Sequence, residues 1–252
     1  MKNKKVLITG ATSGLGKLLA RELATKEYSL IITGRDSNEL KSLVEELNEY
    51  TQVVAYPADL LQAHHLYMLA SIYCEDVSVV INCAADFGPV KNLLDVSAKE
   101  IMDAFKVNVM APISLVQHAL PYMLKSGYGR IINIGSTGGL TGYPLRTPYC
   151  LSKSALVAFT KTLNGEILSG EYGDKDVNVK AFCICPGPFE GKRLETQIRE
   201  RAKYKKVSPK KIREKYESIQ GGIIDPNKIV SMVIATIDPS VTWHDHHDVI
   251  TF

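Results

Sequence analysis

The stretch Thr9-Gly10-Ala11-Thr12-Ser13-Gly14-Leu15-Gly16 follows a short apolar run and precedes a helical pattern. Its glycines let the backbone turn sharply and come close to a bound group. The helix behind them offers free N–H groups and the positive end of its dipole to an anion. The spacing is G-x-x-x-G-x-G, not the G-x-G-x-x-G of the standard fingerprint. The position between a first strand and a first helix still predicts a pyrophosphate-binding turn, rather than a plain structural one. The residues expected to form it are Gly10, Thr12, Ser13, Gly14, Leu15 and Gly16.

Short apolar runs and longer helical patterns alternate along the chain. Near-continuous Val, Ile and Leu in the runs indicates strands buried on both faces, as in a parallel sheet covered by helices. This order predicts one α/β domain, residues 1–252, with a doubly wound parallel sheet of the Rossmann kind. The predicted strands are Val6–Thr9, Leu30–Thr33, Val53–Tyr56, Val77–Asn82, Arg130–Gly135 and Val177–Cys185. The predicted helices are Leu15–Lys26, Ser37–Glu49, Leu60–Cys74, Ala98–Lys125, Pro148–Leu168 and a last one near Asn227–Ile237.

A basic segment interrupts this rhythm, because residues 192–217 hold eleven Lys or Arg against four Glu. Ser208-Pro209 is typical of an N-cap and a first helical residue, so two short amphipathic helices are expected. We interpret residues 188–220 as a helical insertion before the last helix that forms a substrate-binding lid. We interpret its charged side chains as the solvent-exposed face of this lid. The alternatives are a lid that attracts an anionic substrate or the cofactor phosphates, and a macromolecular contact surface.

The second predicted strand ends in Ile31-Ile32-Thr33-Gly34-Arg35. An acidic residue at this point would bond the adenosine ribose hydroxyls and favour NAD. No acid stands there. Instead, Gly34 leaves space and Arg35 supplies a guanidinium suited to a 2′-phosphate. Asp36 is interpreted as the cap of the next helix. The pattern therefore predicts NADP(H) as the cofactor, the alternative being that Arg35 is a solvated loop charge.

Three polar residues make a candidate catalytic group. Ser136 follows a predicted strand at the carboxyl edge, where α/β sheets bind ligands. Tyr149 and Lys153 are four residues apart on a predicted helix, so their side chains share one face. A free tyrosine has a pKa of about 10, and a nearby ammonium lowers that pKa toward the neutral range that acid–base catalysis needs. The serine hydroxyl would then orient a substrate oxygen beside the phenol.

The combination of these features resembles the short-chain dehydrogenase/reductase family, over nearly the whole chain up to about Gly187. The matching motifs are Thr9–Gly16, Asp59-Leu60, Asn82-Cys83-Ala84-Ala85, Lys106-Val107-Asn108-Val109, Ser136, Tyr149-Cys150-Leu151-Ser152-Lys153 and Pro186-Gly187. The resemblance implies an oxidoreductase (EC 1.1.1.-) that moves a hydride between the nicotinamide and a carbonyl or secondary alcohol carbon. Its substrate would be a small molecule.

The resemblance also implies a role for each matching residue. Tyr149 would be the general acid when a carbonyl is reduced and the base in the reverse direction. Lys153 would lower the pKa of Tyr149 and hold the nicotinamide ribose, and Ser136 would position the substrate oxygen. Asn108 would kink its helix and hold a water that links Lys153 to solvent. The other cofactor contacts would come from Asp59, Leu60, Asn82, Ala84, Pro186 and Gly187.

The chain departs from the family's pattern at three places. Ala85 replaces the last glycine of N-N-A-G, and Gly191 stands where a threonine often bonds the nicotinamide carboxamide. The ending, residues 247–252, lacks the usual glycine-rich final strand, which often builds a tetramer interface. A homodimer through the helices Ala98–Lys125 and Pro148–Leu168 is therefore expected beside the homotetramer.

Composition narrows the class of protein further. A formal net charge of +3 gives no argument for nucleic acid as a partner. No window approaches the roughly 18 apolar residues of a membrane span, and the N-terminus has no secretory apolar region. The five cysteines form no C-x-x-C pair and are read as free thiols of a cytoplasmic protein. The cluster Trp243–Asp248 is interpreted as a polar turn before the last strand, so that no metal is expected.

Two other functions are kept open. One is a non-catalytic dinucleotide-binding regulatory protein. The other is a nucleotide-sugar epimerase or dehydratase, which shares the Tyr/Lys pair but is typically longer. The substrate also stays open. Its pocket is expected between 87–90, 138–146 and 188–220, where Leu140, Tyr143, Leu145 and Phe189 are apolar walls and Arg146 would meet an acid group.

Overall fold

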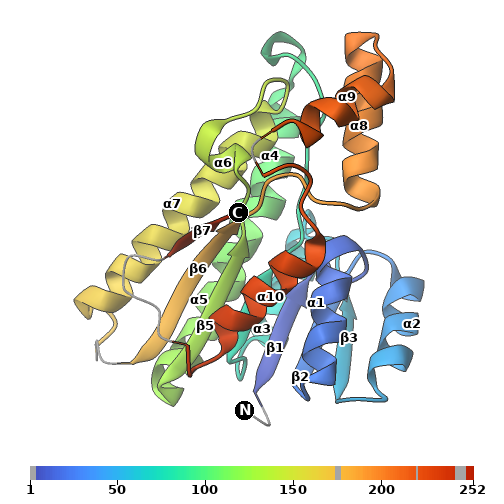
Figure 1. Ribbon diagram of the computed structural model, residues 1–252. Helices are drawn as coiled ribbons and strands as arrows, with labels where there is room; N and C mark the ends of the chain where they lie inside the picture. Colours follow the sequence, from blue (N-terminus) through green and yellow to red (C-terminus); the bar gives the residue numbers. More distant parts are fainter. Residues whose placement is uncertain (1–3, 174–176, 220, 242–247) are drawn as a thin grey trace.

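The computed structural model describes residues 4–173, 177–219, 221–241 and 248–252. Within them, seven parallel strands form one sheet in the order β3-β2-β1-β4-β5-β6-β7 (Figure 1). The strand order reverses between β1 and β4, which is the point where sheets of this kind bind ligands at their carboxyl edge. The strands are β1 Lys5–Thr9, β2 Ser29–Gly34, β3 Val53–Pro57, β4 Val79–Asn82, β5 Tyr128–Ile134, β6 Asn178–Cys185 and β7 Val249–Thr251.

Helices cover both faces of the sheet, as the predicted doubly wound fold requires. One apolar core lies beneath α1, α2 and α10, and a second lies beneath α3, α5 and α7. The α-helices of the described chain are α1 Gly14–Thr25, α2 Ser37–Leu47, α3 Ala63–Tyr73, α4 Ala98–Phe105, α5 Ala111–Ser126, α6 Gly138–Thr141, α7 Thr147–Ser169, α8 Lys192–Lys205, α9 Pro209–Glu217 and α10 Pro226–Ile237.

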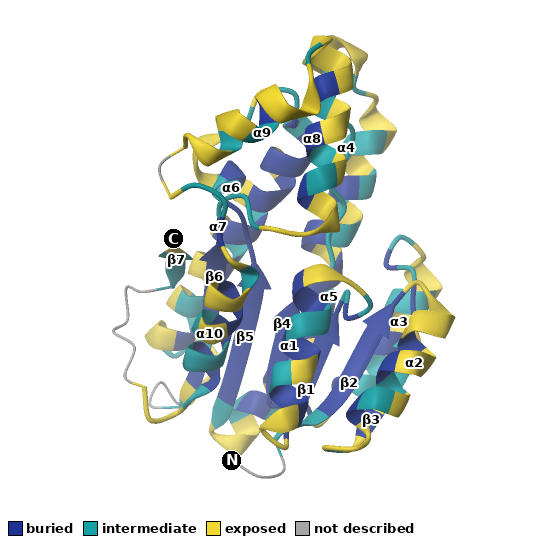
Figure 2. Cartoon of the chain, turned by 45° about the vertical axis from the view of Figure 1, so that its right-hand side comes forward, coloured by how far each residue is buried: buried dark blue, intermediate teal, exposed yellow. Residues whose placement is uncertain are grey.

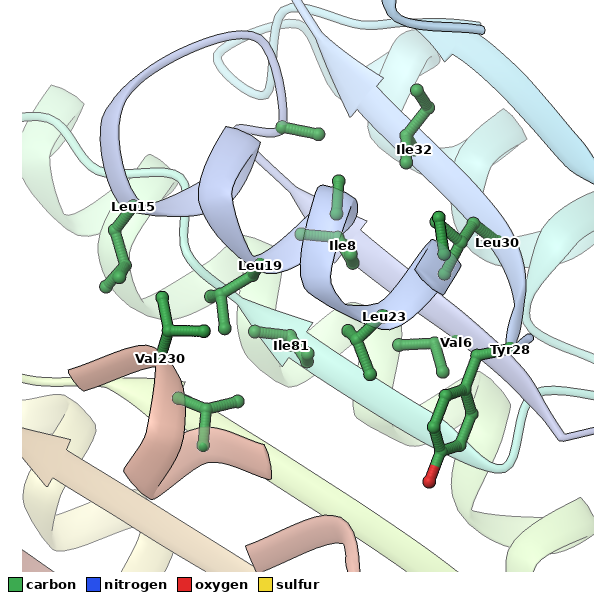
Figure 3. Packing of buried hydrophobic residues seen from close by; sticks show 14 of the residues in the cluster. Val6, Ile8, Leu15, Leu19, Leu23, Tyr28, Leu30, Ile32, Ile81 and Val230 are labelled. Atoms are coloured by element: carbon green, nitrogen blue, oxygen red, sulfur yellow. The ribbon is translucent and has the colours of Figure 1, made fainter. Parts of the chain in front are cut away.

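Strand β1 contributes side chains to both cores, because its residues alternate between the two faces of the sheet. Val6 and Ile8 face the first core, whereas Leu7 faces the second, because successive side chains of a strand point to opposite sides. Leu15, Leu19 and Leu23 recur every four residues on α1 and pack over that strand (Figure 3). This packing places the amino end of α1 directly behind the glycine-rich turn.

The structure refines two of the predicted helices. The segment expected as one helix over Ala98–Lys125 is α4 and α5 joined by a π-helical turn, Lys106–Met110. The helix expected from Leu60 begins at Ala63 instead. There the Asp59 carboxylate accepts a hydrogen bond from the Leu61 N–H at 3.1 Å and turns the chain before the helix starts. Helix α6 has only four residues, two of them glycine, and no periodic pattern announced it.

The basic insertion contains the two amphipathic helices that were predicted, α8 and α9, and Ser208 caps the second by accepting from the Lys211 N–H at 3.3 Å. They stand beyond the carboxyl ends of the strands (Figures 1 and 2). A small core of their own joins them: Leu194, Ile198, Ala202 and Ile212. We call residues 188–220 the lid.

Two expectations from the sequence concern other parts of the chain. Of the polar turn expected within Trp243–Asp248, residues 243–247 lie outside the described residues. Among the residues that the structure describes, no helix is both long enough and apolar enough to cross a membrane.

Candidate active site

The glycine-rich turn lies where β1 meets α1, and its shape depends on two glycines. Gly10 has φ +71°, and a Cβ there would lie 2.8 Å from the Cα of Ala84, so the turn touches the loop after β4. A Cβ on Gly16 would lie 2.3 Å from the carbonyl oxygen of Gly10. Thr9 joins the same two loops, because its hydroxyl accepts from the N–H groups of Cys83 at 3.1 Å and Ala84 at 3.0 Å.

The turn fits a dinucleotide on three observations. The first turn of α1 has no capping side chain and no acidic residue, so its N–H groups are free to bind an anion. A Cβ on Gly14 would meet nothing within 4 Å. Thr33 Oγ1 and Asn82 Oδ1, near the carboxyl ends of β2 and β4, are buried acceptors without a partner among the described residues. Free helix N–H groups, open space beside Gly14 and two unpartnered polar groups thus all occur at the carboxyl edge of the sheet, where the sequence predicted the cofactor.

The end of β2 carries the residues expected to choose between NAD and NADP. Gly34 lets Thr12 pack against it, since a Cβ there would lie 2.6 Å from Thr12 Cγ2. Arg35 is exposed and forms no ion pair within the described chain. Asp36 caps α2, as expected, by accepting from the N–H groups of Asn38 at 3.0 Å and Glu39 at 3.1 Å. The acid beside Arg35 is therefore engaged by the helix.

The other residues expected to contact the cofactor lie at the ends of β3, β4 and β6. Asp59 is half-buried, but the side chain of Leu60 belongs to the core beneath α3 and α5. Asn82 donates to Asn133 Oδ1 at 2.8 Å. Pro186 accepts from the Thr137 N–H at 3.1 Å, which holds the end of β6 beside the segment that follows Ser136.

Ser136 and Tyr149 come together at the carboxyl end of β5. The Ser136 hydroxyl lies close enough to the Tyr149 phenol to lower the pKa of that phenol, and it accepts from the Gly138 N–H at 3.0 Å. Burial raises the pKa of Tyr149, while the nearby Ser136 hydroxyl and the charges of Arg193 and Arg146 lower it. The net direction is upward. The sequence led us to expect that Lys153 lowers the pKa of Tyr149, but the effect of burial, which raises that pKa, is larger.

Lys153 lies behind the tyrosine. Its Nζ donates to the Ile134 carbonyl oxygen at 2.6 Å and lies 5.9 Å from the centre of the Tyr149 ring. Burial lowers the pKa of the Lys153 ammonium to about 8, and the nearby Cys183 and Cys83 thiols oppose this. Burial therefore brings the deprotonation of Lys153 closer to the neutral pH range than that of an exposed lysine.

Asn108 sits in the π-helical turn and is fully buried. Its Oδ1 accepts from the Asp86 N–H at 2.8 Å, and its Nδ2 donates to the Asp86 carbonyl at 2.7 Å and to Ser152 Oγ at 2.8 Å. Ser152 in turn donates to the Tyr149 carbonyl at 2.8 Å. The asparagine thus ties the loop after β4 to the helix that carries Tyr149. Sequence reasoning missed Ser152, because a serine between Tyr149 and Lys153 gives no signal of its own.

Aromatic and cationic side chains surround Tyr149. Phe87 stacks on it with ring centres 4.9 Å apart and planes 18° apart. The Arg146 guanidinium carbon lies 5.0 Å from the centre of the Tyr149 ring, and that of Arg193, from the lid, lies 3.6 Å from the centre of the Phe87 ring. Phe87 and Arg146 belong to segments expected to line the substrate. In the sequence, Arg193 is one of many basic residues of the lid. Only the fold shows that it lies beside Phe87 and the catalytic group.

The fold and this group of residues define a nucleotide-binding α/β oxidoreductase site, and comparison with known proteins gives the family. The family model described as short chain dehydrogenase matches residues 4–203. The uncharacterized oxidoreductase YvrD of Bacillus subtilis is 33% identical over 190 residues, which cover 75% of this chain and 69% of that protein. The NADPH-dependent pterin aldehyde reductase of Arabidopsis thaliana is 30% identical over 170 residues, 66% of this chain and 70% of the relative.

Solved structures show the same fold. An actinorhodin polyketide ketoreductase variant with NADPH superposes with a TM-score of 0.86 at 24% identity, covering 100% of this chain and 97% of the other. An NAD⁺-bound xylitol dehydrogenase gives a TM-score of 0.84 at 20% identity, covering 99% and 97%. The chain belongs to the short-chain dehydrogenase/reductase family, and it is a nicotinamide-dependent oxidoreductase of that family.

Proposed function

We propose that this protein is an NADP(H)-dependent reductase of a carbonyl compound, with Tyr149 as the general acid. The observation that carries the proposal is the grouping of buried Ser136, Tyr149 and Lys153 at the edge of the sheet that also holds the glycine-rich turn. A dinucleotide-binding protein without turnover would not need this arrangement. The substrate names of relatives do not transfer, since they range from a pterin aldehyde to D-beta-hydroxybutyrate.

The reaction divides its tasks among the residues of the site. Ser136 and Tyr149 would hold the substrate oxygen between their hydroxyls, which polarises the carbonyl. The reduced nicotinamide, when bound, supplies the hydride to the carbonyl carbon. Tyr149 gives the oxygen its proton, and a raised pKa keeps the phenol protonated until that moment. Lys153 would hold the nicotinamide ribose and return a proton to Tyr149, and Asn108 would hold the connecting water.

Cofactor preference rests on the end of β2. Arg35 is exposed and has no competing ion pair within the described chain, and Asp36 is used by the amino end of α2. An exposed guanidinium without a partner favours a 2′-phosphate over the free hydroxyl of NAD. The lid would close over the substrate, since Arg193 reaches from α8 to the ring stacked on Tyr149.

Fluorescence titration with NADPH and NADH tests the preference directly. Wild type should bind NADPH more tightly than NADH. Arg35→Ala should weaken NADPH by about tenfold or more and leave NADH unchanged, because one charge-assisted contact to the phosphate is lost. The exposed Lys41 of α2 provides a matched control, Lys41→Ala, which should change neither. Equal binding of the two cofactors by wild type would reject the role of Arg35.

Tyr149→Phe tests catalysis separately from binding. It should bind NADPH like the wild type but reduce a panel of ketones and aldehydes at least about a hundredfold more slowly, since general acid catalysis is lost. Wild-type protein that binds NADPH but is no faster than Tyr149→Phe on every carbonyl tested would instead favour the non-catalytic dinucleotide-binding role.

A further inference from the structure

Arg146 is a buried cation whose charge no part of the described chain neutralises. It is the N-cap residue of α7, three residues before Tyr149, and it is 2% exposed. Its Nη1 and Nη2 are buried and have no hydrogen-bond partner among the described residues. The preceding residue, Leu145, has φ +67°, a conformation that costs a leucine free energy and that the fold nevertheless maintains.

Arg130 shows how this protein buries an arginine for structural purposes. It is also 2% exposed, but its Nε donates to the Thr236 carbonyl at 2.9 Å, and its Nη1 donates to the carbonyls of Gly129 at 2.8 Å and Asn178 at 2.7 Å. A buried guanidinium without such acceptors is strongly unfavourable. Arg146 therefore resembles a binding group rather than a structural one.

The surroundings of Arg146 join the catalytic tyrosine to the lid. Its guanidinium carbon lies 5.0 Å from the centre of the Tyr149 ring and 5.6 Å from that of Phe87. Arg201 of α8 reaches the segment just before it, where Nη2 donates to the Pro144 carbonyl at 3.3 Å. The Nε of Arg201 is likewise buried without a partner. Of the five such atoms in the described chain, three belong to these two arginines.

The acidic side chains of the lid do not supply the missing counter-ion. Arg213 of α9 pairs with Glu190, with Glu195 at 2.6 Å and with Glu217 at 3.2 Å. Neither Arg146 nor Arg201 forms an ion pair with any described residue. Arg146 thus lies beside Tyr149 and Arg201 lies against the segment before Arg146, whereas Glu190, Glu195 and Glu217 are paired with Arg213. Burial lowers the pKa of Arg146, which is the electrostatic cost that an incoming anion would relieve.

We propose that Arg146, assisted by Arg201, binds an anionic oxygen group of the substrate, a carboxylate or a phosphate, while Ser136 and Tyr149 hold its carbonyl oxygen. The substrate is accordingly a short oxo acid or its hydroxy acid product. The two free η nitrogens suit the paired oxygens of such a group. The proposal rests on the proposed reductase function and specifies its substrate class.

Arg146 also has a second effect that the experiment must separate, because its charge lowers the pKa of Tyr149. That effect acts on every substrate alike, whereas anion binding acts only on charged ones. The probes are acetoacetate, compared with methyl acetoacetate, and 2-oxopropylphosphonate, compared with its uncharged dimethyl ester. The variants are Arg146→Gln and a control, Arg199→Gln, which removes an exposed arginine of α8. NADPH affinity and melting temperature show that each variant is folded and loaded.

In wild type, kcat/KM should be at least about tenfold higher for one of the acids than for its ester, as expected for a charge-assisted bidentate contact. Arg146→Gln should remove this preference by raising KM for the acid, and Arg199→Gln should keep it. Which acid is preferred tells carboxylate from phosphate. A preference that survives in Arg146→Gln, or an equal loss for acid and ester, would overturn the proposal.

Binding decides the matter where turnover is too slow to measure. The NADP⁺-loaded wild type should be stabilised against heat by an acid more than by its ester, and loaded Arg146→Gln should not. If the acid and its ester stabilised wild type equally, the proposed anion site would be wrong. The proposed function would still stand as long as the protein bound NADPH and reduced neutral ketones. Absence of NADPH binding would instead reject the proposed function itself.

Discussion

At the scale of the residue, burial shifts the two central titratable groups of the site in opposite directions. It raises the pKa of Tyr149 and lowers that of Lys153 to about 8, because desolvation favours the neutral form of each. The spacing of these residues was readable from the sequence, and so was their shared helix face. The shifts were not, since they depend on how much of the fold covers each group.

Lys153 should lower the stability of the cofactor-free protein, and the effect should depend on pH. The folded-state pKa of about 8 lies below the unfolded value of 10.5, so the penalty is full below pH 8 and is released as the pH rises toward 10.5. Lys153→Met should therefore increase the free energy of unfolding at pH 7 by about 2 kcal/mol, net of the lost hydrogen bond to Ile134. Urea unfolding at pH 7 and pH 9.5 measures it.

The gain should shrink between those two pH values. Lys161→Met, on the exposed side of the same helix, serves as the control and should show no comparable trend. If Lys153→Met were less stable than wild type at pH 7, the ammonium would be well compensated in the folded chain and the desolvation argument would fail.

At the scale of the element, the β1–α1 turn depends on contact with the loop after β4. Gly10→Ala places a Cβ 2.8 Å from the Cα of Ala84 and also holds alanine at φ +71°. Gly127 has the same φ of +71° but open space around it, so Gly127→Ala carries only the conformational strain. We expect a loss of about 1 kcal/mol for Gly127→Ala and clearly more, about 2–4 kcal/mol, for Gly10→Ala.

Chemical denaturation of both variants gives these values, and NADPH titration adds the functional consequence. Gly10→Ala should weaken NADPH binding, whereas Gly127→Ala should leave it unchanged. Equal destabilisation of the two variants would mean that the loop after β4 yields to the new methyl group without cost.

The π-helical turn at Lys106–Met110 shows the limit of pattern reading at this scale. The apolar periodicity of Ala98–Lys125 is typical of one helix, and nothing in it reveals the extra residue in the turn. In that turn, Asn108 forms hydrogen bonds with Asp86 of the loop after β4 and with Ser152 of α7. Only the assembled fold provides those partners.

At the scale of the whole molecule, the lid is a nearly separate small unit. Four buried residues form its core, and Arg213 of α9 pairs with Glu195 of α8, with Glu190 before α8 and with Glu217 of its own helix. Exposed ion pairs contribute little to global stability, so the network should act mainly on local opening. Arg213→Ala should therefore speed tryptic cleavage within residues 192–217 several-fold and leave the melting temperature almost unchanged.

Lys210→Ala is the matched control, because it also removes one tryptic site from α9 but forms no ion pair among the described residues. Mass spectrometry of the first fragments locates the cut. Unchanged cleavage in Arg213→Ala would show that the small apolar core alone keeps the lid closed, whereas a large drop in melting temperature would show that the lid does not open independently.

The features that depend on local sequence pattern could be predicted before the fold was known. Alternating apolar runs and helical periods predicted the parallel sheet, glycine spacing predicted the turn before α1, and four-residue spacing placed Tyr149 and Lys153 on one face. Only the tertiary structure decided which of many arginines lacks a partner, which carbonyl receives Lys153, and in which direction the pKa of Tyr149 moves. The physical reason is that desolvation and ion pairing sum over neighbours far apart in the chain, whereas periodicity needs only adjacent residues.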